Sequence, residues 1–124
     1  MSTIGIDMIE IHRIKKSIKS EAFLKHVFSK EEYDQLKKKN FSPQSVAINF
    51  CAKEAFLKSI GKGLGFSKFS DIQLLREDCG KPYLKLSGVA LDFANKNRLV
   101  FSVSATHTKE YASVVVLAER KEEI

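Results

Sequence analysis

The order of apolar and polar positions predicts strands and helices that are intermixed along the chain. Residues 3–9 are apolar and rich in β-branched side chains, which predicts an opening strand. Beyond this segment the apolar positions recur at helical spacing. Three helices are expected there, over about residues 10–20, 21–28 and 29–39. The third helix begins with a capping box, because Ser29 is followed three positions later by Glu32.

A longer helix is predicted after a break at residues 40–43. It covers residues 45–60 without an internal Gly or Pro, and Gly61 ends it. Alternating or β-branched segments predict the remaining strands, at 72–76, 83–86, 99–104 and 111–118, and a short helix is expected at 89–96. Residues 77–82 form the turn of a hairpin, and residues 119–124 are expected to be a frayed, charged tail.

This order of elements, with hairpin connections late in the chain, predicts an α+β fold. A length of 124 residues supports one core, so we expect a single domain over residues 1–124, with helices packed on a mainly antiparallel sheet. No run of eighteen apolar residues occurs, and residues 1–30 lack a basic segment followed by an apolar one. The expected location is therefore the cytoplasm, with no membrane partner. Cys51 and Cys79 are expected to stay reduced there.

The net charge of +6 lies almost entirely in the first half of the chain, residues 1–62. An uneven basic balance indicates a polyanionic partner, and charge alone leaves open a nucleic acid, an acidic protein or a phosphorylated ligand. The aromatic residues fall at core positions, with neither an interleaved Arg-Gly-Phe pattern nor zinc-ligand spacing. A nucleic-acid partner is therefore disfavoured.

Candidate chemistry is concentrated in residues 49–65, which read N-F-C-A-K-E-A-F-L-K-S-I-G-K-G-L-G. Glu54 and Lys58 are four apart and so share one helix face, ahead of a glycine-rich loop. The pair is typical either of an ordinary surface ion pair with a glycine cap or of a site for a phosphate and its metal. Asp7 has two interpretations as well, a cap for the next helix or a metal ligand at a strand end. His107, which is expected just after a strand, is either structural or a base.

Three separated motifs together resemble one family. They are I-G-I-D-M-I-E-I-H-R-I at 4–14, F-C-A-K-E-A-F-L-K with G-K-G-L-G at 50–65, and S-A-T-H-T-K-E-Y-A at 104–112. In this order, and in a chain of this length, they resemble the holo-acyl-carrier-protein synthases, the small bacterial 4'-phosphopantetheinyl transferases. The resemblance covers nearly the whole chain.

The resemblance implies transfer of 4'-phosphopantetheine from coenzyme A to a serine of apo acyl carrier protein, with release of adenosine 3',5'-bisphosphate. It places this reaction in fatty acid biosynthesis, a branch of lipid biosynthesis. The alternative substrates are carrier domains of secondary-metabolite synthases. Asp7 and Glu54 match the family's Mg²⁺ ligands, and Glu54 and Lys58 its catalytic residues. Either Glu54 or a water on the metal takes the serine proton, and the water is favoured because a ligated carboxylate is a poor base. Mn²⁺ in place of Mg²⁺ is left open.

The resemblance also implies binding surfaces. Residues expected to contact coenzyme A are Lys58, Gly61, Lys62, Gly63, Gly65, Lys81, Pro82, Ser104, Thr106 and His107. Arg13 matches the residue that docks the acidic carrier, with Lys16 and Lys19 beside it. The family assembles as a homotrimer whose active sites are shared between subunits. Many relatives carry Arg where this chain has Asn49, and Lys53 or Lys62 is expected to compensate.

Overall fold

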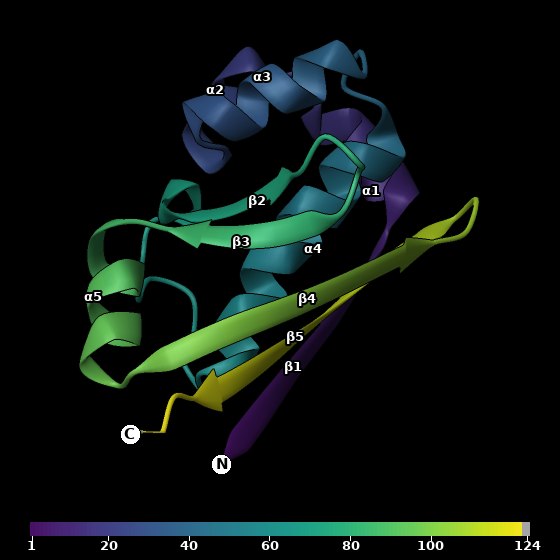
Figure 1. Cartoon of the computed structure of the whole chain (residues 1–124). Coiled ribbons are helices and arrows are strands. Elements are labelled where there is room, and N and C mark those ends of the chain that lie inside the picture. The colour runs from purple at the N-terminus through teal and green to yellow at the C-terminus, as the bar shows by residue number, and fades with distance from the viewer. Residues whose placement is uncertain (123–124) are drawn as a thin grey trace.

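The computed structural model describes residues 1–122, and strands and helices are intermixed along them as the sequence predicts (Figure 1). In chain order the elements are β1 (Ser2–Glu10), α1 (Ile11–Ser17), α2 (Glu21–Val27), α3 (Lys30–Lys38), α4 (Pro43–Ser59), the 3-10 turn η1 (Phe69–Asp71), β2 (Ile72–Arg76), β3 (Pro82–Leu86), α5 (Gly88–Lys96), β4 (Leu99–His107) and β5 (Tyr111–Arg120). The predicted α+β class is confirmed. No helix within the described residues is long and apolar enough to cross a membrane.

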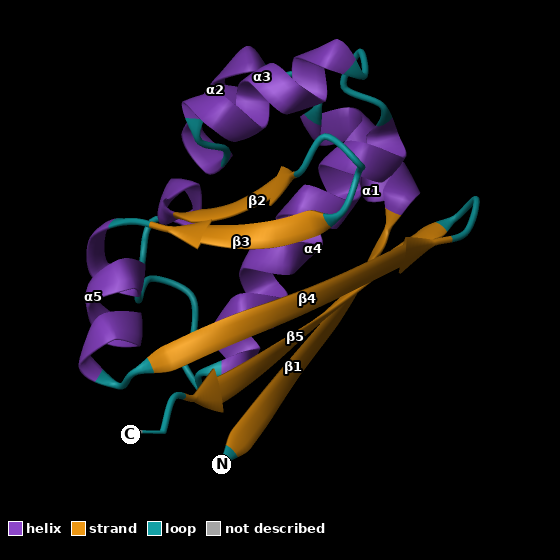
Figure 2. Ribbon diagram, in the orientation of Figure 1, coloured by secondary structure: helices purple, strands orange, loops and turns teal. Residues whose placement is uncertain are grey.

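The strands form two antiparallel sheets. One has the order β1-β5-β4, and the other is the β2-β3 hairpin. Figure 2 shows α4 running between the three-stranded sheet and the hairpin, with α2 and α3 beyond the hairpin. Helix α4 contacts β1 and β5 on one side and β2 on the other. The predicted antiparallel pairing and the helix-on-sheet packing are therefore both confirmed.

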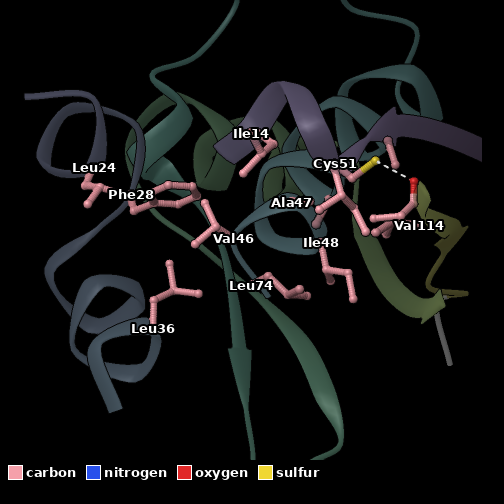
Figure 3. Close-up of a cluster of buried hydrophobic side chains, with 14 of the residues drawn as sticks. Ile14, Leu24, Phe28, Leu36, Val46, Ala47, Ile48, Cys51, Leu74 and Val114 are labelled. Carbon is pink, nitrogen blue, oxygen red and sulfur yellow. Dashed lines mark hydrogen bonds between the residues drawn. The ribbon is translucent and has the colours of Figure 1, made fainter. Parts of the chain in front are cut away.

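The hydrophobic core is organised around α4, which is buried on nearly every face. Figure 3 shows Leu24 of α2, Phe28 just after α2 and Leu36 of α3 on the same side of the cluster as Val46 of this helix. At the other side of the cluster Cys51 faces β5. A helix enclosed in this way carries few polar side chains, and those it does carry have specific partners.

Gly5 sets the distance between β1 and α4. A Cβ atom at this position would lie 2.1 Å from the Ala55 carbonyl oxygen and 2.4 Å from the Ser59 amide nitrogen. Two residues earlier, the Thr3 hydroxyl donates to the Ser59 carbonyl oxygen at 2.6 Å. Alternate residues of a strand share a face, so Asp7 also points toward α4.

Several predicted boundaries move. Helix α4 begins at Pro43 instead of residue 45, because the Ser42 side chain accepts from the Ser45 amide as the N-cap. Helix α1 ends early at Ser17, since Ser20 caps the next helix. The prediction of a frayed tail is wrong for residues 119–120. They belong to β5, where Glu119 pairs with β1 and β4 and Arg120 pairs with β4. The last part of that tail, residues 123–124, lies outside the described residues.

A buried polar cluster joins α3, α4 and β2. The predicted capping box between Ser29 and Glu32 is present, and the same Glu32 carboxylate accepts from Lys53 Nζ at 2.6 Å. Its second oxygen accepts from the Leu74 amide and from Asn49 Nδ2, each at 3.1 Å.

This cluster corrects the expectation that Lys53 compensates for the arginine missing at position 49. The Lys53 ammonium is fully buried and also donates to the Phe69 and Ile72 carbonyl oxygens. It therefore holds the core together and has no access to a ligand. Asn49 is buried beside it and is bonded to Glu32 and to the Leu74 carbonyl oxygen.

Candidate active site

Asp7 lies within β1 and faces the C-terminal half of α4. Its Oδ1 atom is 3.1 Å from Lys58 Nζ, which also donates to the Ile6 carbonyl oxygen at 3.1 Å. Its Oδ2 atom accepts from Cys51 Sγ at 3.3 Å. Asp7 does not cap α1, because α1 starts after Glu10. The ion pair of Lys58 is with Asp7, so the interpretation of Lys58 as the surface partner of Glu54 is wrong.

Asp7 and Glu54 line one pocket of about 630 Å³ between β1, α1 and α4. We call it the carboxylate pocket. Arg13 and Lys16 also line it, as do Met8, Ile9, Ile14, Ser17, Phe23 and Phe50. The structure thus brings the two predicted metal ligands together with two of the three predicted docking residues. The third, Lys19, follows α1 in the chain and is exposed, but it does not line the pocket.

Two carboxylates and two basic side chains line this pocket, and burial and charge both act on Glu54. Partial burial raises the pKa of Glu54 above its ordinary value, and the neighbouring Asp7 charge raises it further. Lys58 and Arg13 act in the opposite direction, though less strongly than burial and Asp7 together. An added cation would stabilise the ionised form of Glu54, in the same direction as Lys58 and Arg13 do.

The donor set fits a hard divalent cation. No group of three or more His, Cys, Asp or Glu side chains that could hold a metal occurs within residues 1–122. The carboxylate pocket offers two, both with oxygen donors. Mg²⁺ prefers oxygen ligands, keeps several waters and is commonly bound by one or two carboxylates. Asp7 and Glu54 match that requirement.

A second pocket, of about 500 Å³, gathers the predicted ligand residues from the second half of the chain. We call it the hairpin pocket. It contains Lys81, Pro82, Ser104, Thr106 and His107, together with Lys39, Gln44, Ser45, Ile48, Arg76, Val103 and Ala105. Strand β4 runs to His107, so the expectation that His107 follows a strand is wrong. Its position is the end of an edge strand, with Nδ1 3.1 Å from the Thr108 carbonyl oxygen.

The glycine-rich loop lies at the opposite end of α4 from the hairpin pocket. Gly61 ends the helix in a Schellman motif, with the Lys62 amide donating to the Leu57 carbonyl oxygen at 2.9 Å. The Lys62 ammonium lies over the rings of Phe66 and Phe93, 5.3 Å and 5.5 Å from their centroids. Gly63 and Gly65 are exposed. The predicted coenzyme A residues therefore form two groups within one chain.

Strand register also separates Asp7 from Ser104 and Thr106 of the hairpin pocket. Asp7 pairs with the buried Val114, which pairs with Ala105, so these three share the face that α4 covers. Ser104 and Thr106 flank Ala105 and project from the other face of the sheet. One chain therefore holds the carboxylates and part of the predicted nucleotide site on opposite faces.

The residues at and beside these sites that were not predicted include Gly5, Cys51, Lys39 and Arg76. Gly5 has a recognisable signal, since a glycine inside a strand often marks close approach of another backbone. The contact of Cys51 with Asp7 depends on helix phase, which the sequence alone leaves unspecified. Lys39 and Arg76 line the hairpin pocket from two other elements. Both are basic and reach the pocket, whereas the Lys53 ammonium is buried in the core and cannot reach it.

The structure thus places one helix on a three-stranded antiparallel sheet, with two carboxylates and an amine at their junction. Residues 3–116 match the 4'-phosphopantetheinyl transferase superfamily, and the chain belongs to this family.

Relatives within the family include holo-[acyl-carrier-protein] synthases. A holo-[acyl-carrier-protein] synthase of Alkaliphilus metalliredigens is 40% identical over 117 residues, covering 93% of this chain and 96% of the relative. A crystal structure of the Bacillus anthracis synthase in complex with CoA (3',5'-ADP) has a TM-score of 0.80 at 32% identity and covers 96% of each chain. The Helicobacter pylori synthase in complex with coenzyme A also has a TM-score of 0.80 at 32% identity, covering 94% of this chain and 99% of that one.

Proposed function

We propose that this protein transfers 4'-phosphopantetheine from coenzyme A to a serine of apo acyl carrier protein and releases adenosine 3',5'-bisphosphate. The observation that carries the proposal is the carboxylate pocket, where Asp7, Glu54, Arg13 and Lys16 meet beside Lys58. Membership of the transferase superfamily and the 40% identity to a holo-[acyl-carrier-protein] synthase support the same reaction.

The reaction is a displacement at phosphorus. The serine oxygen forms a bond to the phosphorus that carries the pantetheine arm, and the bond from that phosphorus to the bridging oxygen breaks. The adenosine bisphosphate leaves with the electron pair, and the serine proton must be removed. Catalysis of such a step requires positioning and neutralisation of phosphate charge. The carboxylate pocket supplies groups for both tasks.

Asp7 and Glu54 would hold Mg²⁺, which when bound neutralises pyrophosphate charge and orients the phosphate oxygens. Lys58 has a half-exposed side chain and bonds only one Asp7 oxygen, so its ammonium can turn to the pyrophosphate or to the leaving phosphate. The raised pKa of Glu54 suits a group that accepts the serine proton itself or orients the water that accepts it. The Lys62 ammonium and the backbone amides at Gly63 and Gly65 would contact phosphate oxygens. The Gly61 amide, also expected there, instead donates to the Lys58 carbonyl oxygen at 3.2 Å.

The hairpin pocket would take the nucleotide end of coenzyme A. Lys39, Arg76 and Lys81 place three basic groups around it, and Ser104, Thr106 and His107 add neutral donors and acceptors. Lys39 and Arg76 are the residues we propose in place of the arginine missing at position 49.

Acyl carrier protein would dock on α1. Arg13 lies at the carboxylate pocket, so a carrier bound there presents its serine to the reacting phosphorus. We expect Arg13→Ala to raise the KM for acyl carrier protein about tenfold at low ionic strength, with kcat little changed, because a steering contact is lost. The difference should shrink in high salt. Initial rates at several carrier concentrations measure it.

The matched control for this change is Lys96→Ala, which removes an exposed cation from α5. It lowers the net charge equally and should leave the KM for the carrier unchanged. Equal effects of the two substitutions would contradict docking at Arg13 and leave only a general charge effect.

We further propose that three copies assemble through the outer face of the three-stranded sheet. Ile4, Ile6 and Met8 project from β1 with 66%, 62% and 65% of their surfaces exposed. Val115 and Leu117 of β5 lie beside them in register. An apolar patch of this kind favours a protein partner. A neighbouring copy would also bring its hairpin pocket, which borders this face, to the carboxylate pocket.

We expect Ile6→Glu to give a folded single chain with transfer activity reduced at least about 100-fold, because half of each shared site is then missing. Light scattering during gel filtration should give three times the 14.0 kDa chain mass for the unmodified protein and one chain mass for the variant. Val89→Glu, at a half-exposed apolar residue of α5, serves as the control and should keep both assembly and activity.

The setting we propose is fatty acid biosynthesis in the cytoplasm, with carrier domains of secondary-metabolite synthases as alternative substrates. The direct test incubates the protein with apo acyl carrier protein, coenzyme A and Mg²⁺ and measures adenosine 3',5'-bisphosphate by ion-exchange chromatography. Release should match the carrier supplied and should vanish for a carrier whose modified serine is alanine. Release that ignores this substitution would show hydrolysis of coenzyme A and would refute the transfer.

A further inference from the structure

The thiol of Cys51 is enclosed between Asp7 and β5. The residue has no exposed surface. Its sulfur lies 3.3 Å from Asp7 Oδ2 and 3.7 Å from the Ala112 carbonyl oxygen, and Figure 3 shows the thiol directed from α4 toward β5. Both groups that the sulfur contacts are oxygen acceptors, so the thiol is the donor in this contact.

The two oxygens of Asp7 are held in different ways. Oδ1 is held by Lys58, whose long side chain is 56% exposed and free to reorient. Oδ2 is held by Cys51, whose short side chain is fixed by the packing of α4. A carboxylate has about four acceptor positions, so both hydrogen bonds leave acceptor positions open toward the carboxylate pocket.

We propose that Cys51 is a positioning residue, which orients the Asp7 carboxylate so that its free lone pairs face the cation site shared with Glu54. The inference rests on the proposed metal site. In the proposed reaction the Lys58 ammonium turns to a phosphate group of the substrate, and its hydrogen bond to Asp7 is then lost. Cys51 keeps the carboxylate in place through that change, because its own position depends on the core alone.

A simpler role for Cys51 would be to fill space in the core. Gly5 already brings β1 against α4, and a small side chain at position 51 fits between them. Under that role the loss of the sulfur changes stability and leaves the affinity for a cation unaltered. The two roles therefore differ in a binding measurement that involves neither substrate.

The experiment is titration of the full chain with Mn²⁺ alone, in which electron paramagnetic resonance measures the free ion. We expect Cys51→Ala to weaken Mn²⁺ binding about tenfold, the low end for loss of a group that orients a metal ligand, because a thiol is a weak donor. Cys51→Ser keeps a donor and should stay closer to the unmodified protein. Val46→Ala removes more volume from the same helix, away from Asp7, and should leave the affinity unchanged.

Three results would overturn the inference. Equal Mn²⁺ affinity of Cys51→Ala and the unmodified protein would do so, while leaving the metal site itself standing. So would equal weakening by Val46→Ala, or by Cys51→Ser, since packing would then account for the effect. If the unmodified protein binds no Mn²⁺ at all, the proposed metal site fails, and the role of Cys51 fails with it.

Discussion

Replacement of Glu54 by Gln is expected to lower phosphopantetheine transfer by about 10²–10³-fold, the usual loss when one group that stabilises developing charge is removed. Gln keeps the size of Glu54 but removes one of the two carboxylate charges in the carboxylate pocket. Initial rates with saturating coenzyme A and varied Mg²⁺ measure the loss. Activity at the unmodified level, still sensitive to EDTA, would contradict the role of Glu54.

The same substitution should make the protein more stable without metal. Burial and Asp7 raise the pKa of Glu54 above 4.5, so the native state holds its proton more tightly than the unfolded chain. The ionised form therefore opposes folding, and the cost appears as pH rises from 4.5 through the raised pKa. Thermal unfolding in EDTA should show Glu54→Gln melting higher than the unmodified protein at pH 7 and equally at pH 4. A lower melting temperature at pH 7 would contradict the electrostatics described for the site.

The largest effect on stability is expected for Lys53→Met, at about 3–5 kcal/mol, because breaking a buried ion pair leaves the Glu32 carboxylate without its opposite charge. Both side chains of the pair have zero exposure, and their charged atoms are 2.6 Å apart. Urea unfolding followed by circular dichroism measures the change. Adding Glu32→Gln to Lys53→Met should recover part of the loss, since the unpaired charge is then gone.

An exposed ion pair provides the control. Lys85 and Glu31 are also 2.6 Å apart, but both side chains are at least half exposed. Lys85→Met should therefore change the unfolding free energy little, because water screens such pairs. If Lys53→Met and Lys85→Met had equal small effects, the buried cluster would not be the tie between α3, α4 and β2 that the geometry indicates.

The prediction of elements from the sequence succeeded where local chemistry decides them. The capping box at Ser29, the glycine end of α4 and the hairpin turn before Pro82 depend on neighbouring residues and were placed correctly. The strands β4 and β5 are longer than predicted, because each extends the other through pairing that is distant in sequence.

The site was predicted less completely, because helix phase decides which side chains meet. Consecutive residues of α4 point about 100° apart, so Lys53 enters the core while Glu54 reaches the pocket. Both carry charge in the same motif, and nothing in the sequence distinguishes their directions. The pairing of Lys58 with Asp7 instead of Glu54 likewise depends on how closely β1 approaches α4 at Gly5.

The central claim is transfer to a carrier serine at the Asp7–Glu54 site, and intact-mass analysis of apo acyl carrier protein tests it most directly. The carrier is incubated with this protein, coenzyme A and Mg²⁺, alongside samples with EDTA and with Glu54→Gln. We predict that the carrier gains the mass of one phosphopantetheine group, and that EDTA and Glu54→Gln each suppress the gain. An unmodified carrier in the complete mixture, with the protein folded and several carriers tried, would contradict the proposed function.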